Sequence, residues 1–345
     1  MRTTLPALAV ALGLCLAPGP SQAGLYNPAD PVPYPPPQTF QQFRLELSEL
    51  RSIPNDQKTS PTRARVLQRV AALEAKEQAA GLSVEDRVNL AECYVRLLKG
   101  EEAVHVLAPA EAQDPGNFLV LANLATANYL VGSGTANPGE KLARLQQAVQ
   151  YQRRVLQAWP RVWAGFTTEE LAWFRRAERY YLRLLEQRWQ EARLQEPRAA
   201  EGLDPLFPGL RFVGPSGEYE AGELAPEEAD ALPVERVPLV SQLCLWLPFD
   251  NRLYWLLGEL LNAQGNIADA GTVMMELEDA RGFHNRELHR HRQVVLEARQ
   301  AAELLASDRG PVVKEQLLWL LAPRGATAAP GAGGLASEAA WAAAL

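Results

Sequence analysis

Few residues in this sequence are of the kinds that build disulfide frameworks, haem sites or metal centres. Among 345 residues there are three cysteines and four histidines, and none of the patterns CxxCH, HExxH or GxSxG occurs. Basic residues are outnumbered 34 to 41, which gives a formal net charge of −7. Because phosphate binding needs a clustered cationic surface, this balance argues against general nucleic-acid binding. We predict no cofactor and no catalytic activity, since an enzyme here would need a dispersed site without a local motif.

Long hydrophobic runs are missing too, so no stable transmembrane segment is expected in the mature chain. The stretch LPALAVALGLCLA near the N-terminus is too short to span a bilayer as a helix. Arg2 before it and the small residues SQA before Gly24 are typical of a signal peptide over residues 1–23, cleaved after Ala23. Lipidation at Cys15 and a retained anchor are the alternatives. We therefore expect an exported protein, periplasmic or associated with the cell envelope.

Cys93 and Cys244 remain after removal of the signal peptide. Both lie in apolar helical patterns, where a cysteine behaves as a small buried hydrophobe. We expect two buried free thiols rather than a disulfide, even in an oxidising compartment.

Composition divides the mature chain into three parts. Residues 24–38 form a Pro-rich arm that favours an extended polyproline conformation, either a spacer or a ligand for an aromatic groove. Helical periodicity then continues over residues 39–321, which we predict to be one helical domain. Residues 322–345 are an Ala/Gly/Pro-rich tail with the composition of a flexible linker.

Small residues and prolines recur at fixed intervals within the helical domain. The interval from Ala103 to Pro115 is 12 positions, and the interval from Ala148 to Pro160 is again 12. The stretch GSGTANPGEKL at 132–142 accounts for an 11-residue insertion in the second unit, which we predict to be a surface loop. Self-similarity of this kind predicts stacked helical hairpins.

The pattern resembles the tetratricopeptide repeat (TPR), whose units are pairs of antiparallel helices. Three units carry it, at 84–117, 118–160 and 251–282. Small residues stand where two helices cross closely, large residues fill the holes beside them, and proline ends the second helix. The signature residues are Leu90, Ala91, Tyr94, Ala103, Pro115, Leu124, Ala125, Ala148, Pro160, Leu257, Gly258 and Ala270. The chain departs from the pattern at Arg87, where a large aromatic is preferred, and at Gly282, which replaces the closing proline.

Residues 161–250 interrupt the repeats. Thr167, Thr168, Glu169 and Glu170 make a strong helix start, and a long amphipathic helix follows. Two short β-prone runs then flank the turn GPSG, which predicts a small inserted β-hairpin at about 206–222. After the last repeat, residues 284–306 and 311–321 are expected to be closing helices.

Three stretches imitate ligand-binding motifs. GTANPGEKL lacks the hydroxyl residue and the preceding strand of a phosphate-binding loop. In HNRELHRH, His284, His289 and His291 cannot converge on one helix face, so we predict no metal site and interpret the stretch as a solvated basic turn, with Glu287 and His291 as an i,i+4 pair. The arginines of residues 175–188 are interpreted as a solvated face above a core stripe, with an anionic partner surface as the alternative.

The resemblance implies an all-α, TPR-like helical-hairpin superhelix that acts as a non-catalytic protein–protein interaction scaffold. Its concave groove would receive a peptide or partner protein. Within the last repeat we expect Leu257, Gly258 and Leu261 to face the partner helix of the hairpin. The predicted partner-binding residues of the groove are Arg252, Trp255, Glu259 and Asn262. Trp255 could instead pack on a neighbouring unit or on the inserted hairpin. The alternative functions are a structural subunit of a permanent envelope assembly and an envelope enzyme with a dispersed site.

Overall fold

The computed structural model describes residues 39–57, 60–163, 166–195 and 202–306. Every regular element within those ranges is helical, so the fold class is all-α. The helices are α1 (Phe40–Ser52), α2 (Pro61–Ala80), α3 (Val84–Arg96), α4 (Gly100–Gln113), α5 (Phe118–Gly134), α6 (Pro138–Gln157), α7 (Thr168–Leu194), α8 (Pro226–Asp230), α9 (Arg236–Trp246), α10 (Asn251–Asn262), α11 (Ile267–Met275), the π-helical turn η2 (Glu276–Ala280) and α12 (Arg286–Ala306). The predicted signal peptide, Pro-rich arm, second closing helix and tail lie outside the described residues.

The chain divides into two compact units at Leu296, which lies within α12. Of the second unit the structure describes only residues 297–306, the end of that helix. All contacts discussed below belong to the first unit.

Helix starts coincide with polar residues that cap the first turn. Ser83 accepts a hydrogen bond from the N–H of Asp86 at 3.1 Å, while the Asp86 carboxylate accepts from the N–H of Ser83 at 3.0 Å. Thr167 and Glu170 form the same reciprocal capping box at the start of α7. Asp250 caps α10 by accepting from a backbone N–H. These caps satisfy N–H groups that a helix start leaves without intrahelical partners.

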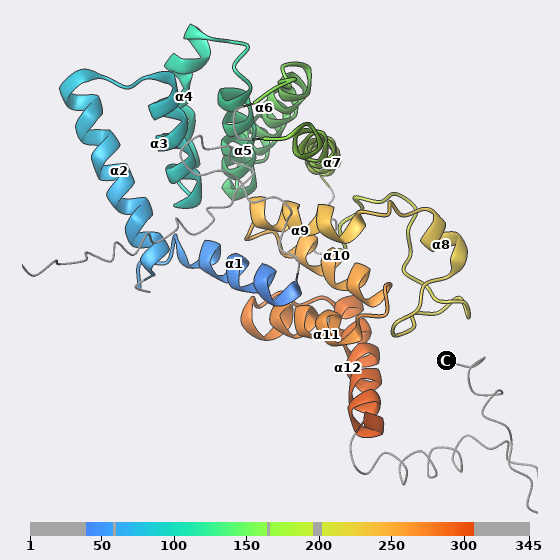
Figure 1. The fold of residues 1–345 in the computed structure, drawn as a ribbon. Helices are drawn as coiled ribbons and strands as arrows, with labels where there is room; N and C mark the ends of the chain where they lie inside the picture. The colour runs from blue at the N-terminus through green and yellow to red at the C-terminus, as the bar shows by residue number, and fades with distance from the viewer. Residues whose placement is uncertain (1–38, 58–59, 164–165, 196–201, 307–345) are drawn as a thin grey trace, which may run out of the picture. The chain divides into compact units, whose positions relative to one another are not determined.

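Helices α3 to α7 pack in chain order, each against the next (Figure 1). The expected helix pairs at 84–117, 118–160 and 251–282 correspond to α3 with α4, α5 with α6, and α10 with α11. Small residues stand at the contacts of these pairs, and the alanines among them are 0% exposed: Ala91, Ala103, Ala125, Ala148 and Ala270. A Cβ added at Gly258 of α10 would lie 2.9 Å from Cγ1 of Val273 in α11. The absence of larger side chains therefore permits the close helix approach.

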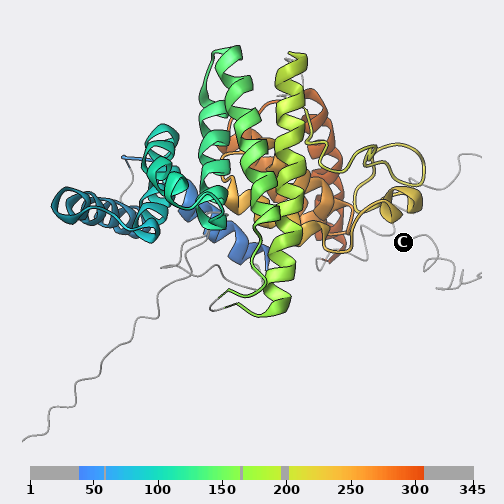
Figure 2. The same ribbon diagram turned by 90° about the horizontal axis from the view of Figure 1, so that it is seen from above.

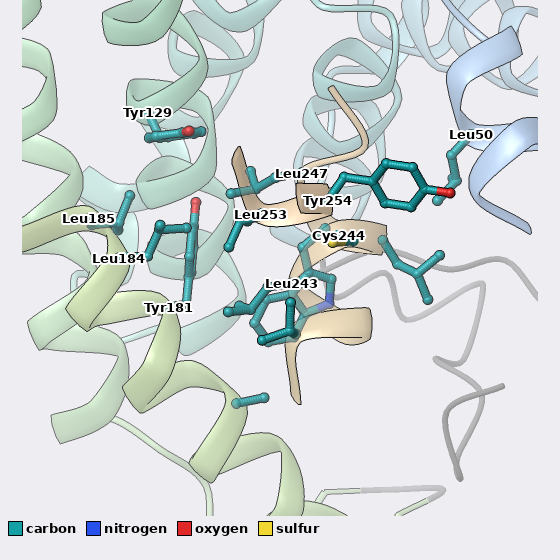
Figure 3. Packing of buried hydrophobic residues seen from close by; sticks show 14 of the residues in the cluster. Leu50, Tyr129, Tyr181, Leu184, Leu185, Leu243, Cys244, Leu247, Leu253 and Tyr254 are labelled. Atoms are coloured by element: carbon teal, nitrogen blue, oxygen red, sulfur yellow. The ribbon is translucent and has the colours of Figure 1, made fainter. Parts of the chain in front are cut away.

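The hydrophobic core extends from these pairs to α9 and α10. Helix α9 contacts both α7 and α1, and both ribbon views place α9 and α10 next to the α5–α7 group (Figures 1 and 2). Tyr181 of α7 lies near Leu253 of α10, and Tyr254 points toward Leu50 of α1 (Figure 3). These contacts join segments that are far apart in the sequence into one packed interior.

The 11-residue insertion lengthens two helices instead of forming a surface loop. Helices α5 and α6 contain 17 and 20 residues, compared with 13 and 14 in α3 and α4. Gly132 and Gly134 belong to the end of α5, and Pro138 is the first residue of α6. Proline at the first helical position loses no hydrogen bond, and Asn137 caps the helix. Residues 137–142 therefore begin α6 rather than a loop.

The expected β-hairpin at 206–222 is wrong. The chain does reverse at GPSG, where the N–H of Gly214 donates to the carbonyl of Glu218 at 2.8 Å, but the flanking residues form no strand. Their side chains pack into the helical core instead, with Phe212 4% exposed. Backbone groups beyond the turn bond to Asn262 of α10, which replaces the cross-strand pairing that a hairpin requires.

Cys93 and Cys244 are buried free thiols, as expected. Burial raises the pKa of both thiols above the usual value. No helix among the described residues has the length and apolar character needed to cross a bilayer.

Candidate functional site

The four residues predicted to face a groove lie on α10 but are buried within the chain. Trp255 and Glu259 are 0% exposed, Asn262 3% and Arg252 6%. Leu257, Gly258 and Leu261 are also buried, and Gly258 faces α11 as expected. The expected open groove at this face of α10 is therefore wrong, because other segments of the same chain cover it.

The segment after the GPSG turn covers the C-terminal end of this face. The side-chain amide of Asn262 donates to the carbonyl of Glu220 at 2.9 Å, and its oxygen accepts from the N–H of Gly222 at 2.9 Å. This two-point contact resembles the pairing of one strand with another and fixes an extended backbone on α10. A Cβ at Gly222, where φ is +79°, would lie 3.1 Å from Ile267, so glycine permits the close approach.

Helix α12 covers the middle of the face through a buried polar network. Oε1 of Glu259 accepts from Nε1 of Trp255 at 2.6 Å and lies 2.8 Å from Nδ1 of His291. His291 is 3% exposed and stacks on the ring of Tyr219, with centroids 3.6 Å apart. Burial and the nearby charge of Glu259 raise the pKa of Tyr219. The network joins three segments and leaves no open path to Trp255.

The expectation of a solvated basic turn is thus wrong for His291. The predicted pair with Glu287 exists only at 4.0 Å, whereas Glu259 is the near partner. His289 lies 3.2 Å from the carboxylate of Glu278.

Arg252 belongs to a second buried network of charges. Its guanidinium donates to both carboxylate oxygens of Glu191 in α7, at 2.8 and 2.9 Å, and to the carbonyl of Gly202 at 3.0 Å. Arg188, one turn earlier in α7, pairs with Asp204 and with Asp250, the latter at 3.0 Å. Its side chain is 10% exposed, so it does not belong to the solvated face predicted for the arginines of α7.

The carboxylates of this second network differ in pKa. Burial alone would raise the pKa of Asp250, but the charge of Arg188 and a hydrogen bond from the N–H of Leu253 hold it below the usual value. The hydroxyl of Tyr129 also donates to Asp250, at 3.0 Å. Burial raises the pKa of Asp204 despite the charge of Arg188. Both aspartates face the guanidinium of Arg188, which compensates its buried charge within the network.

Two neighbouring cavities open beside this network and share Tyr129, Ser133, Asp250 and Arg252 in their walls. The larger, of about 590 Å³, lies along α5, α6 and α7 and has charged walls. The smaller, of about 340 Å³, lies between the C-terminal end of α3, helix α5 and the α9–α10 turn. Its walls are mostly apolar, and its outer residues Leu98 and Phe249 are 44% and 38% exposed.

Leu98 adopts a backbone conformation that leucine rarely has. Its φ is +60°, in the left-handed region, at the turn that ends α3. The N–H of Lys99 donates to the carbonyl of Tyr94 at 2.8 Å, and the N–H of Leu98 donates to Val95 at 3.0 Å. This bonding pattern ends many helices, usually with glycine at the left-handed position. Here a large apolar side chain is held at the cavity mouth instead.

Sequence reasoning did not find this cavity. Leu98 and Phe249 lie in short turns without a motif, and they line one cavity only because α3, α5 and α9 pack together. One signal was available: leucine stands at a helix end where glycine is the usual residue. Comparisons with family models, with curated proteins and with solved structures found no match for this chain.

Proposed function

We propose that this chain is a non-catalytic protein-interaction scaffold whose binding site is the apolar cavity at Leu98 and Phe249. The carrying observation is Leu98, an exposed leucine kept at the cavity mouth in a backbone conformation that costs about 1–2 kcal/mol relative to the usual one. Glycine would relieve that cost, so packing and stability do not account for leucine here. A side chain retained in a strained, exposed position supports a role in binding.

The chemistry of the cavity fits one apolar side chain of a partner. Most of its wall is apolar, while Asp250 and Tyr129 add polar groups. Pockets that anchor a partner residue combine such an apolar wall with few polar groups that fix orientation. The partner is thus a protein or peptide that inserts an apolar residue between Leu98 and Phe249.

The arrangement of the helix pairs supports the same function. The helix pairs fall at the repeat positions, and their signature alanines are buried at the helix contacts. In stacked hairpins of this kind the helices form a rigid frame that presents binding surfaces. The face of α10 that carries Trp255 is covered by other segments of the chain, so the partner binds in the cavity beside it rather than on that face.

Two features favour reversible binding over the alternative functions. Apart from the residues at the cavities, exposed large hydrophobic residues lie on separate segments, such as Leu67 in α2, Leu194 in α7 and Val234 in the turn before α9, whereas a permanent assembly buries a large contiguous apolar patch. The charged residues Asp250 and Arg252 of the larger cavity are each paired with described residues, which suits a structural role better than acid–base catalysis. We further propose export to the periplasm or cell envelope, after cleavage at Ala23.

The test is quantitative affinity capture from an envelope extract of the source organism. The bait is the mature protein, as wild type, as Leu98→Gly and as Phe249→Ala. The matched control is Val162→Ala, which removes an apolar side chain that is 84% exposed and lines neither cavity. We expect at least one protein captured by the wild type and the control to be lost from both cavity variants. Equal capture by all four baits would refute the proposed site.

A further inference from the structure

A third cavity, of about 1030 Å³, lies on the other side of Leu98 and Phe249. It is bounded by α1, by the α9–α10 turn and by the end of η2. Leu45 of α1, 63% exposed, also lines it. Three arginines, Arg44, Arg51 and Arg281, contribute to its walls. Two carboxylates, Glu49 and Glu276, line it as well. The cavity is thus larger than the apolar cavity beside it, and arginines outnumber acidic residues in its walls.

Two of these arginines are held in place by aromatic rings and backbone. The guanidinium of Arg281 lies 3.6 Å from the ring centroid of Tyr254. That of Arg51 lies 4.9 Å from the centroid of Phe249, and its Nη1 donates to the carbonyl of Pro248 at 2.8 Å. Stacking of this kind restricts a guanidinium and leaves its edge N–H groups free to donate.

Neither Arg51 nor Arg281 has a carboxylate partner within the described ranges. Both acidic residues of the cavity wall bond elsewhere: Glu276 accepts from Nε of Arg44 at 2.9 Å and from the hydroxyl of Tyr254 at 2.6 Å, and Glu49 accepts from the hydroxyl of Thr62 at 2.9 Å. Other partly buried arginines of the chain, such as Arg252, do form ion pairs. Arg51 and Arg281, like Arg63 and Arg236, are instead partly buried arginines whose hydrogen bonds and ring contacts within the described ranges involve no carboxylate.

Electrostatics agree with this geometry. Burial lowers the pKa of Arg51 to about 10, and the positive charge of Arg281 acts in the same direction. Burial also lowers the pKa of Arg281. Two like charges close enough to oppose one another would both be stabilised by an anion placed between them.

We propose that this cavity binds an acidic segment of a protein partner, with carboxylates on Arg51 and Arg281 and apolar side chains on Leu45 and Phe249. Charge complementarity selects the acidic residues, and the exposed apolar residues beside the arginines select a peptide over a lone anion. The volume agrees, because a single phosphate or carboxylate would fill little of it. The inference rests on the proposed function in one respect: the ligand is part of a protein, and its apolar anchor enters the adjoining cavity.

The experiment uses the mature full chain and two fluorescein-labelled synthetic peptides. One alternates glutamate and leucine, and the other has glutamine in place of every glutamate. Fluorescence anisotropy at low salt is expected to show saturable binding of the glutamate peptide only. In Arg51→Gln/Arg281→Gln the affinity should fall at least about tenfold, because two charge-assisted hydrogen-bonding groups are lost. Arg179→Gln, which removes an exposed arginine of α7 that does not line this cavity, should bind as the wild type does.

Two further measurements keep the test decisive. Circular dichroism and a urea titration establish that the variants are folded, and the single variants replace the double variant if it is not. Arg281→Lys retains the charge but loses the planar donor geometry, so its affinity should lie between those of the wild type and Arg281→Gln.

Three outcomes would overturn the inference. The first is unchanged affinity for the glutamate peptide in the arginine variants, and the second is equal binding of the glutamine peptide. The third is binding of inorganic phosphate by a protein that binds neither peptide. Its failure can be told apart from failure of the proposed function. A captured partner that depends on Leu98 but not on Arg51 and Arg281 would refute the acidic-segment inference and leave the scaffold function intact. If the peptide binds through Arg51 and Arg281 but no captured partner depends on Leu98, the acidic-segment inference stands and the proposed binding site at Leu98 is refuted.

Discussion

At the scale of single residues, Leu98 and Trp255 are two large apolar side chains in opposite environments. Leu98 is exposed and strained at a cavity mouth, whereas Trp255 is enclosed on every side. The backbone conformation of Leu98 destabilises the folded state, whereas Trp255 stabilises it through burial and a hydrogen bond to Glu259. A change at Leu98 should therefore affect binding, and a change at Trp255 should affect folding.

Leu98→Gly and Leu98→Ala should separate backbone strain from the side chain's role. Both remove the apolar side chain, but only glycine relieves the positive φ, so the glycine variant should be more stable than the alanine variant by about 1 kcal/mol. Urea denaturation with unchanged m-values measures this difference. Partner capture should be reduced to the same extent in both. A glycine variant that is the less stable of the two would show that the turn is not strained.

Trp255→Ala should destabilise the protein by about 3–5 kcal/mol, because it leaves a large cavity beside Phe283 and His291. Trp255→Phe is the matched variant: it keeps an aromatic ring but removes the donor to Glu259, for which we expect about 1–3 kcal/mol. Thermal melting and urea titration measure both. If Trp255→Ala kept wild-type stability and lost partner capture, the residue would line a groove, contrary to its burial here.

At the scale of helices, the sequence was most informative where the determinants are local. Caps such as Ser83 and Thr167, and small residues such as Ala91 and Ala103, follow spacings set by one or two helices. The structure has contacting helices at these positions. The insertion at 132–142 was misjudged because its glycines and proline indicate a loop, although Pro138 and Asn137 are also a good helix start.

The cover on α10 could not be predicted from such local signals. Asn262 bonds to Glu220 and Gly222, about forty positions away along the chain, and Arg188 meets Asp204 and Asp250 from two further segments. An irregular segment has no hydrophobic periodicity from which its packing position could be predicted. The amphipathic pattern of α7 likewise placed Arg188 on a solvated face, because Asp204 and Asp250, which pair with it, lie outside that helix.

Gly258→Leu tests the close approach of α10 and α11. The added side chain would begin 2.9 Å from Cγ1 of Val273, so the two helices must separate or shift. Overpacking of this kind should cost about 1–3 kcal/mol of unfolding free energy. Gly139→Leu is the control, since a Cβ there meets only the Asn137 side chain at 3.4 Å, and it should change stability by less than about 1 kcal/mol. Equal stability of the two variants would mean that the helix crossing is loose.

At the scale of the first compact unit, the Asp250 network decides whether the helices unfold together. The carboxylate of Asp250 binds Tyr129 of α5 and Arg188 of α7, and it also caps α10. Stacked helical pairs that contact only their neighbours can unfold one after another. A buried network that joins three non-adjacent helices opposes this, because opening α7 or α10 separates the charges of Arg188 and Asp250, and opening α5 removes the hydrogen bond from Tyr129.

The two buried thiols report on this coupling, since Cys93 belongs to α3 and Cys244 to α9. In the wild type both should become reactive toward a maleimide at the same urea concentration, as mass spectrometry of labelled peptides can measure.

Asp250→Ala should lower the free energy of unfolding by about 3–5 kcal/mol, because Arg188 loses one of its two carboxylates and α10 loses its cap. Because Cys244 lies closer to position 250 along the chain, it should then react at lower urea than Cys93. Asp279→Ala removes an exposed ion pair with Arg292 and should leave the two midpoints together, within about 1 kcal/mol of the wild type. Two separate midpoints in the wild type would show that the network does not couple the helices, and that α3 and α9 belong to independently unfolding parts.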